Sequence, residues 1–309
     1  MSTATYFVCG ATGTQGGAVV NNLLKHGAKV HAMTRNVDSP AARSLQARGV
    51  VLAKGDFASA DDEDTLRQSM QGCSGVFINL MPSFTDSTSE RTQAQRILTV
   101  AHEANVQHVI YSSGFTVNEP ERLSTWDPTN LVAQFILSKQ AIEISVRAAQ
   151  FKNWTILRPG NFMANYLDPL VRMYPGLVET GVFTTALRPD TQLPMVDHND
   201  IGAFAAAAFL NPTRFNKQEI EIASEFLTVD QVMQALSRAT GKQFSAVYMS
   251  DEEVEAQKAQ NPFIEGQILS RDMAQFVDLD QVRAWGVPLG SFEEFLVREK
   301  DSVKSTYSV

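Results

Sequence analysis

The chain has 309 residues, of which 44% are hydrophobic and 19% charged, as in an ordinary soluble globular protein. Its net charge of −8 argues against direct nucleic-acid binding, which favours a basic surface. The longest apolar run, Ile201–Leu210, is too short to cross a bilayer, and Met1–Thr5 leaves no room for a signal peptide before the first strand. The two cysteines, Cys9 and Cys73, cannot build a disulfide framework. We therefore expect a cytoplasmic protein that does not enter membranes.

Strand and helix patterns alternate along the first half of the chain. The predicted strands are short and apolar: Tyr6–Cys9, Lys29–Met33, Val50–Ala53, Val76–Leu80, His108–Tyr111 and Trp154–Leu157. The predicted helices between them are Gly17–Lys25, Pro40–Arg48, Asp62–Met70, Glu90–Asn105 and Leu131–Ala149. Short apolar strands separated by helices are typical of a parallel sheet covered on both faces. The pattern predicts an α/β fold with a doubly wound parallel sheet.

The pattern changes after Pro159, where prolines become frequent and the strands fewer. We predict a helix over Asp200–Leu210 with Asn199 as its N-cap, and a second helix that starts after Thr228 and ends at Gly241. The two further predicted strands are Glu219–Ala223 and Phe244–Met249. The sequence thus predicts one domain over residues 1–159 and a smaller α/β lobe over residues 160–309, interleaved with the end of the sheet.

A glycine-rich turn joins the first predicted strand to the first predicted helix. Gly10, Gly13 and Gly16 have the spacing G-x-x-G-x-x-G, close to the dinucleotide-binding fingerprint G-x-G-x-x-G. The first glycine allows the tight turn, the second lets a diphosphate approach the backbone, and the third lets the helix pack on the strand. The diphosphate then lies on free N–H groups at the helix N-terminus. The residues expected to contact the cofactor here are Gly10, Thr12, Gly13, Thr14, Gln15 and Gly16.

Ligands of this architecture bind at the carboxyl ends of the strands. Arg35 follows the second strand, where an acidic residue binds the ribose of NAD and an arginine suits the 2′-phosphate of NADP. We therefore expect NADP(H) in preference to NAD(H), although Asp38 nearby leaves NAD(H) open. After the third strand, Asp56 and Phe57 are placed to bind the adenine amine and to stack on the adenine ring, unless Asp56 only serves as a cap.

The ends of the fourth, fifth and sixth strands are expected to line the nicotinamide half of the cofactor. The residues at these ends are Asn79, Leu80, Met81, Ser112, Pro159, Asn161 and Phe162. Ser112 and its neighbour Ser113 are placed to hold substrate or cofactor, but a serine pair that ends a strand is also common turn chemistry. The five histidines have no metal-binding spacing, so we expect no metal site.

Several of these segments resemble the NmrA-like family of atypical short-chain dehydrogenase/reductases. The segments are Gly-Ala-Thr-Gly-Thr-Gln-Gly-Gly at 10–17, Met-Thr-Arg-Asn at 33–36, Lys-Gly-Asp at 54–56, Leu-Arg-Pro-Gly-Asn-Phe at 157–162, Val-Asp-His-Asn-Asp-Ile-Gly at 196–202 and the region from Leu227 to Lys242. The resemblance covers about nine-tenths of the chain. It implies a Rossmann domain that binds NADP(H) and a second lobe that faces the substrate. Within the family, some members are reductases and others are redox sensors or transcriptional co-regulators.

Lys139 is the counterpart of the short-chain dehydrogenase lysine, which holds the nicotinamide ribose and lowers the pKa of a tyrosine four residues earlier. Phe135 stands at that earlier position, so the usual tyrosine mechanism is absent. Three accounts stay open. Lys139 donates the proton itself; or it anchors the ribose while water or another side chain, with Tyr166 as the nearest candidate, supplies the proton; or it only binds cofactor and no reaction occurs.

The first interpretation is therefore an NADPH-dependent oxidoreductase that reduces a small hydrophobic carbonyl, quinone, imine or enone. The alternative is a non-catalytic NADP(H)-sensing regulator that binds a protein partner. Phe135 supports the alternative. Sensor-type members of the family carry a lysine on the helix after the fourth strand, and Thr92 or Gln93 stands at that position here, which weakens the alternative. A homodimer or a regulatory partner is compatible with either interpretation.

Overall fold

The computed structural model describes residues 4–258 and 261–308, so positions 1–3 of the opening segment lie outside the described residues. The chain forms two compact units that exchange segments. The first unit consists of Met1–Val117, Phe135–Arg158 and His198–Ile220, and the second of Asn118–Gln134, Pro159–Asp197 and Glu221–Val309. The chain passes from the first unit to the second between residues 158 and 159. A division of the chain at a single point does not describe these units, because residues 198–220 return to the first one.

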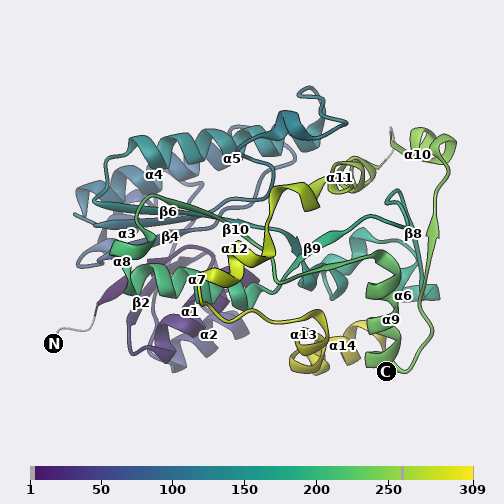
Figure 1. Cartoon of the computed structure of the whole chain (residues 1–309). Helices are drawn as coiled ribbons and strands as arrows, with labels where there is room; N and C mark the ends of the chain where they lie inside the picture. Colours follow the sequence, from purple (N-terminus) through teal and green to yellow (C-terminus); the bar gives the residue numbers. More distant parts are fainter. Residues whose placement is uncertain (1–3, 259–260, 309) are drawn as a thin grey trace. The chain divides into compact units, whose positions relative to one another are not determined.

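A seven-stranded sheet is the centre of the first unit, with the strand order β10-β6-β5-β4-β1-β2-β3 (Figure 1). The strands are β1 (Thr5–Val8), β2 (Lys29–Thr34), β3 (Val51–Lys54), β4 (Gly75–Ile78), β5 (His108–Ser112), β6 (Asn153–Pro159) and β10 (Gln218–Ile222). The pairs between β3 and β6 in this order are parallel. The chain runs outward from β1 to β3 and then from β4 to β6, which is the doubly wound order predicted from the sequence.

Helices cover both faces of this sheet (Figure 1). The helices of the first unit are α1 (Thr14–Lys25), α2 (Pro40–Ala47), α3 (Glu63–Met70), α4 (Ser89–Glu103), α5 (Leu131–Ala148), α7 (His198–Leu210) and the short α8 (Pro212–Phe215), with the start of α5 contributed by the second unit. Helices α3, α4 and α5 pack their apolar side chains on one face, around Leu66, Ile97 and Val146. On the other face α1 crosses α7 so closely that a Cβ at Gly202 would lie 2.5 Å from the Ala18 carbonyl.

The second unit contains a three-stranded sheet of order β11-β9-β7 and a parallel pair, β12 and β8. These strands are β7 (Asn161–Phe162), β8 (Val182–Thr185), β9 (Leu193–Val196), β11 (Glu225–Leu227) and β12 (Ser245–Tyr248). Its helices are α6 (Leu177–Thr180), α9 (Val229–Thr240), α10 (Asp251–Lys258), α11 (Pro262–Ser270), α12 (Leu279–Ala284), α13 (Phe292–Arg298) and α14 (Lys300–Tyr307). Helix α9 starts with the capping box of Thr228 and Gln231 and ends at Gly241 in the left-handed region, as predicted.

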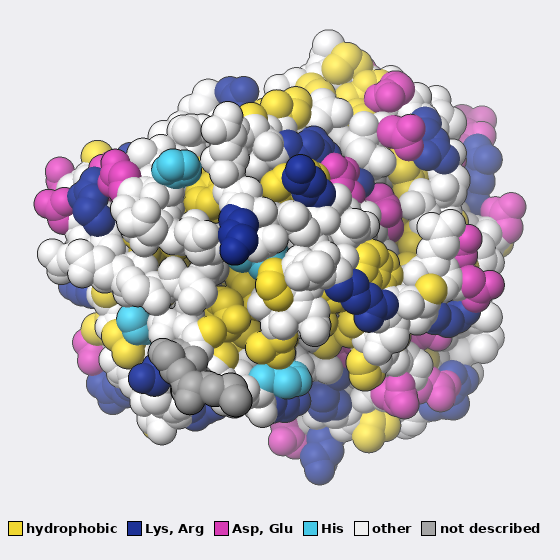
Figure 2. Space-filling model, turned by 60° about the vertical axis from the view of Figure 1, so that its left-hand side comes forward, with side chains coloured by type: hydrophobic (Ala, Val, Ile, Leu, Met, Phe, Trp, Pro, Cys, Tyr) yellow, Lys and Arg dark blue, Asp and Glu magenta, His cyan; other side chains and the backbone are white. Residues whose placement is uncertain are grey.

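The prediction that Asn199 caps the next helix was wrong, because α7 already begins at His198. Asn199 lies inside the first turn, and its side-chain oxygen accepts a hydrogen bond from Asn22 of α1 at 3.4 Å. No helix in the described part of the chain is long and apolar enough to cross a membrane. On the face drawn in Figure 2, the Lys and Arg side chains are separated by polar and apolar ones.

Candidate functional site

The glycine turn after β1 has the geometry that its spacing predicts. Gly10 has a φ of +65°, in the left-handed region that favours glycine, and its carbonyl accepts a hydrogen bond from the N–H of Gly13 at 2.9 Å. A Cβ at Gly16 would lie only 2.2 Å from the Gly10 carbonyl oxygen. Glycine at position 16 therefore allows the first turn of α1 to lie directly on the loop that leaves β1.

The N-terminus of α1 is open for an anion. Its N-cap is Gly13, no side chain caps it, and the first turn contains no acidic residue. Thr12 and Thr14 on either side are exposed. The first N–H groups of a helix have no partner within it and carry partial positive charge, so an uncapped terminus is a binding site for phosphate. The loop and the helix together fit a dinucleotide diphosphate.

The ends of β4 and β5 lie beside this turn. A Cβ at Gly10 would be 3.4 Å from the side-chain nitrogen of Asn79, and the Ser112 hydroxyl donates a hydrogen bond to Oε1 of Gln15 at 2.8 Å. The structure thus brings together four of the predicted cofactor residues. Leu80, by contrast, is buried in the apolar core under α3 and α4, which counts against contact between its side chain and a cofactor.

The end of β2 presents an exposed arginine. Arg35 is exposed, whereas the carboxylate of Asp38, three residues later, forms an ion pair with Arg43 at 3.4 Å. An acidic residue that binds a ribose must offer a free carboxylate, and an exposed guanidinium can bind a phosphate with two parallel hydrogen bonds. The Arg35 guanidinium is therefore accessible for the predicted contact with a 2′-phosphate, and the Asp38 side chain is 79% exposed as well.

The loop after β3 is folded on itself. The Asp56 carboxylate accepts a hydrogen bond from the N–H of Ala58 at 2.9 Å, as in an Asx turn. The ring of Phe57 meets the ring of Phe7 edge-on, with 6.4 Å between the centroids. Both side chains therefore have structural contacts here, and their predicted roles at the adenine stay predictions.

Lys139 lies on α5, and its ammonium contacts a buried carboxylate of α4. Lys139 Nζ donates to Oε1 of Glu90 at 2.6 Å, and Glu90 is only 1% exposed. Glu90 belongs to the first turn of α4, which begins at the carboxyl edge of the sheet after β4. The ion pair therefore fixes the Lys139 ammonium at the level of this edge, where ligands of such sheets bind.

One turn before Lys139, a phenylalanine faces an exposed aromatic side chain. The rings of Phe135 and Phe84 meet edge-on with 5.1 Å between their centroids, and Phe84 is 62% exposed. Met81, in the same loop after β4, is 76% exposed. Large apolar side chains so exposed often mark a surface that binds an apolar molecule.

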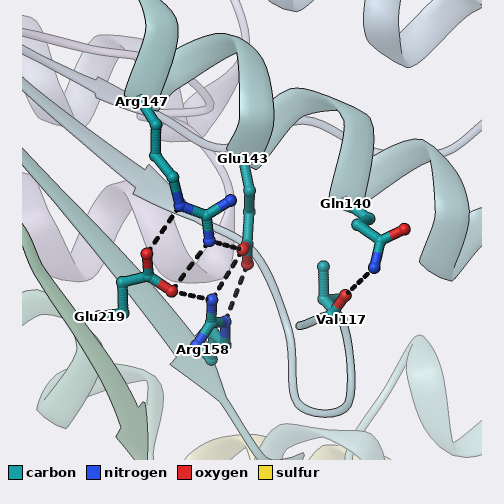
Figure 3. Close-up of polar contacts among 6 residues, drawn as sticks. All are labelled: Val117, Gln140, Glu143, Arg147, Arg158 and Glu219. Atoms are coloured by element: carbon teal, nitrogen blue, oxygen red, sulfur yellow. Dashed lines mark hydrogen bonds and ion pairs between the residues drawn. The ribbon is translucent and has the colours of Figure 1, made fainter. Parts of the chain in front are cut away.

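A network of two arginines and two glutamates fixes α5 against the sheet (Figure 3). Glu143 is fully buried one turn after Lys139, and it accepts hydrogen bonds from Arg158 of β6 and Arg147 of α5 at 2.7 Å. Both arginines also bind Glu219 of β10. Burial favours the protonated form of Glu219, but the two guanidinium groups lower its pKa below the usual value. The network holds the helix that carries Lys139 in one position.

Two hydroxyl groups at the end of β5 are buried beside the carboxylates. The side-chain oxygens of Tyr111 and Ser113, and Oε2 of Glu90, make no hydrogen bond of normal geometry with the residues that the structure describes. Burial, together with the negative charges of Glu90 and Glu143, raises the pKa of Tyr111 well above its usual range. Tyr111 therefore stays protonated, with a hydrogen available for donation.

The last group of predicted site residues lies in the second unit. Asn161 donates through its side-chain nitrogen to Sδ of Met195 at 3.4 Å, Pro159 is buried, and Phe162 is half-buried. Tyr166 is 1% exposed in the apolar core of this unit, and burial raises its pKa well above the usual range. A hydroxyl so enclosed is poorly placed to give a proton to a substrate, so the burial counts against the predicted catalytic role of Tyr166.

Two residues of the candidate site were missed by the sequence analysis. Glu90 looked like an ordinary acidic residue in a first helical turn, and Phe84 like part of a loop. Only the pairing with residues of α5, far away in the sequence, shows their position. Among residues 4–258 and 261–308, no group of three or more His, Cys, Asp or Glu side chains is arranged to hold a metal ion.

Comparison with protein families gives one match over nearly the whole chain. The model of the NmrA-like family matches residues 2–293. Among curated relatives, the NmrA-like family domain-containing oxidoreductase himF of Aspergillus japonicus is 28% identical over 258 residues, which are 79% of this chain and 75% of the relative. The corresponding oxidoreductase FrzB of Cladobotryum sp is 29% identical over 254 residues, which are 76% of this chain and 73% of that protein.

Solved structures with the same fold have different stated roles. NmrA, described as a negative transcriptional regulator and solved in complex with NAD, has a TM-score of 0.76 at 20% identity, with all of both chains covered. The triphenylmethane reductase of Citrobacter sp., complexed with NADP(H), has a TM-score of 0.72 at 20% identity over 96% of this chain and 99% of its own. The NADPH-dependent quinone oxidoreductase QOR2 of Escherichia coli has a TM-score of 0.72 at 21% identity over 95% and 99%.

Proposed function

The chain belongs to the NmrA-like family, and from this premise we propose that it is an NADP(H)-dependent oxidoreductase that reduces a small hydrophobic acceptor. The observation that carries the proposal is the open N-terminus of α1 behind the Gly10–Gly16 turn, beside Asn79 and Ser112. This arrangement fits a dinucleotide diphosphate. The curated relatives are named oxidoreductases, and two of the similar structures are reductases that bind NADPH or NADP(H).

The exposed guanidinium of Arg35 supports NADP(H) as the cofactor. A 2′-phosphate placed at the end of β2 meets Arg35, while the Asp38 carboxylate is already paired with Arg43. A charged bidentate contact of this kind contributes about 1.5–3 kcal/mol. We therefore assign the 2′-phosphate to Arg35 and the diphosphate to the glycine turn.

The nicotinamide half is assigned to the carboxyl edge near Lys139. When bound, NADPH supplies a hydride from C4 of its nicotinamide ring. Lys139, fixed by Glu90, binds the nicotinamide ribose. Ser112, which is hydrogen-bonded to Gln15, lines the pocket on the side of the nicotinamide ring. With phenylalanine at position 135, the chain supplies no tyrosine next to Lys139, so the proton comes from Lys139 or from solvent.

The acceptor is proposed to be flat and apolar. Phe84 exposes a large apolar ring beside Phe135, and Met81 of the same loop is also exposed. Such surfaces hold an apolar molecule through burial and ring stacking. Catalysis then depends mainly on positioning, because holding cofactor and acceptor in contact makes the bimolecular reaction effectively unimolecular. A carbonyl, quinone, imine or enone with an apolar body meets these requirements.

The alternative proposal is a sensor that binds NADP(H) and a protein partner without turnover. Phe135 in place of a proton donor favours it, and one similar structure is described as a negative transcriptional regulator. The two proposals differ in one measurable property, which is transfer of hydride.

The experiment that tests the proposal uses NADPH with deuterium at C4, prepared separately in the R and S forms. The protein is incubated with each form and a triphenylmethane dye, an enone or a cyclic imine, whose reduced products keep the deuterium on carbon, and the products are analysed by mass spectrometry. Reduction of a naphthoquinone, whose product loses the label to water, is followed by the oxidation of NADPH. We expect deuterium in a product from one of the two forms only. Tight NADPH binding without transfer to any acceptor would favour the sensor, and absence of NADPH binding would contradict both proposals.

A further inference from the structure

Glu90 is a buried carboxylate whose position the fold does not require. It is 1% exposed, although it lies in the first turn of α4, where a solvent-exposed acidic residue would stabilise the helix dipole equally well. Burial of a carboxylate is unfavourable unless an opposite charge and further hydrogen bonds compensate for the loss of water. An apolar side chain would fill the same space without this penalty. The carboxylate therefore calls for an explanation other than stability.

The partner of Glu90 supplies this explanation. Oε1 accepts a hydrogen bond from Lys139 Nζ at 2.6 Å, and the lysine side chain is only 18% exposed. A lysine has four rotatable bonds, and its ammonium reaches many positions unless something holds it. The contact across two helices selects one of these positions, at the carboxyl edge of the sheet.

The second carboxylate oxygen lies in a buried polar region. Oε2 of Glu90 and the hydroxyls of Tyr111 and Ser113 make no hydrogen bonds of normal geometry among the described residues. Tyr111 is close enough to Glu90 for the carboxylate charge to raise its pKa further. The charged contact that fixes the carboxylate is thus the one between Oε1 and Lys139.

We propose that Glu90 is a positioning residue of the cofactor site, whose buried carboxylate holds the Lys139 ammonium in place for the nicotinamide ribose. The inference rests on the proposed function, because it assumes that Lys139 binds the ribose of NADP(H). The pocket then depends on a residue of α4 that need not touch the cofactor. Without Glu90, Lys139 must be immobilised when the cofactor binds, and part of the binding free energy is lost.

The test is a comparison of two ligands on the Glu90→Gln variant. NADP⁺ contains the nicotinamide ribose, whereas adenosine 2′,5′-bisphosphate contains only the half that is assigned to Arg35 and the glycine turn. Titration calorimetry of both ligands needs no turnover. We expect the dissociation constant of NADP⁺ to rise about tenfold, equivalent to about 1.4 kcal/mol, and that of adenosine 2′,5′-bisphosphate to change less than twofold. Equal weakening of both ligands, or tighter binding of NADP⁺, would overturn the inference.

Two further variants separate positioning from a general loss of stability. Asp197→Asn removes another fully buried carboxylate, which is paired with Arg298 in the second unit. We expect it to lower the melting temperature and leave the ratio of the two dissociation constants unchanged. Lys139→Met is expected to weaken NADP⁺ binding as Glu90→Gln does, and the double variant no more than Lys139→Met alone. Additive effects of Glu90→Gln and Lys139→Met would overturn the inference, because they show that Glu90 acts independently of Lys139.

The same titrations distinguish a failure of this inference from a failure of the proposed function. If the wild-type protein binds NADP⁺ but reduces no acceptor, the enzyme proposal fails while the ratio of dissociation constants still decides the role of Glu90. If the wild-type protein is active and the Glu90→Gln variant binds both ligands normally, with kcat within twofold of wild type, Glu90 has only a structural role. If the wild-type protein binds neither ligand, both proposals are wrong.

Discussion

Replacement of Gly16 by alanine puts the glycine turn to a direct test. A Cβ at this position would lie 2.2 Å from the Gly10 oxygen, 2.4 Å from the Gly10 carbonyl carbon and 2.7 Å from the Cys9 oxygen. All three atoms belong to the backbone, so no side-chain rotation relieves the overlap, and α1 must move by roughly 1 Å to restore normal contact. Forced overpacking of this kind lowers the free energy of unfolding by about 1–3 kcal/mol. The better helix propensity of alanine offsets up to about 1 kcal/mol of this loss.

Gly17, the next residue, provides the matched control. Its Cβ would lie 3.4 Å from the Ala11 oxygen, which is an ordinary contact. Gly17→Ala is therefore expected to stabilise the protein by about 0.5–1 kcal/mol, because alanine forms helix more readily than glycine. One added methyl group on adjacent residues should thus have opposite effects.

Urea denaturation and NADPH titration measure both consequences. We expect Gly16→Ala to lower the urea midpoint and to weaken NADPH binding at least tenfold, because the helix N-terminus moves away from the turn. Gly17→Ala should raise the midpoint and leave the dissociation constant unchanged. If Gly16→Ala keeps the wild-type dissociation constant, the diphosphate does not lie on this turn. Equal urea midpoints for the two variants would refute the packing argument.

Three other predictions concern charge. Arg35→Glu should weaken NADPH binding by about 10- to 100-fold and leave NADH binding nearly unchanged in fluorescence titrations, because the 2′-phosphate loses its bidentate partner. Glu143→Gln should lower the free energy of unfolding in urea by about 3 kcal/mol, because the fully buried Arg158 loses the charge of its carboxylate partner. Arg147→Met should lower it by about 1 kcal/mol or less, because Arg147 is partly exposed to solvent. Burial lowers the pKa of His108 to about 4. Between pH 6.5 and 4 the His108 imidazole is therefore protonated in the unfolded chain and neutral in the folded chain. Stability should fall by roughly 3 kcal/mol as the pH drops through this window, and His108→Asn should remove most of the dependence.

Each of these predictions has an outcome that contradicts it. Equal weakening of NADPH and NADH in Arg35→Glu would place the 2′-phosphate elsewhere. Similar losses in Glu143→Gln and Arg147→Met would mean that burial does not decide the value of the ion pairs. An unchanged pH profile of urea unfolding in His108→Asn would mean that other groups cause the acid sensitivity.

The sheet and the glycine turn could be predicted because their signals are local. The spacing of Gly10, Gly13 and Gly16 reports a backbone geometry that few other residues allow, and short apolar strands report burial on both faces. The prediction for Asn199 failed: its side chain suits an N-cap, but the residue lies inside the first turn of α7 and accepts a hydrogen bond from Asn22 of α1. Local preference is a weak guide wherever packing offers a stronger contact.

The candidate site could be predicted only in part for the same reason. Arg35 directly follows β2 and Ser112 ends β5, so the rule for strand ends selects both as candidates. Glu90 is paired with Lys139, which lies 49 residues later in the sequence. The residue spacing within a single helix or strand cannot predict such a pair. The prediction for Tyr166 rested on its closeness in the sequence to the last sheet strand, which says nothing about exposure, and its side chain is buried among aromatic rings.

The crossing of α1 and α7 also has a consequence for biosynthesis. Helix α1 carries the N-terminus that is proposed to bind the diphosphate, yet its apolar side is covered by residues 198–210, through the close approach of Gly202 to Ala18. A growing chain on the ribosome thus presents the glycine turn early but lacks its covering helix until most of the polypeptide has been made. A protein truncated at residue 159 would leave the side of α1 around Ala18 and Asn22 without its covering helix. We expect such a fragment to be a substrate for chaperones rather than a working nucleotide-binding domain.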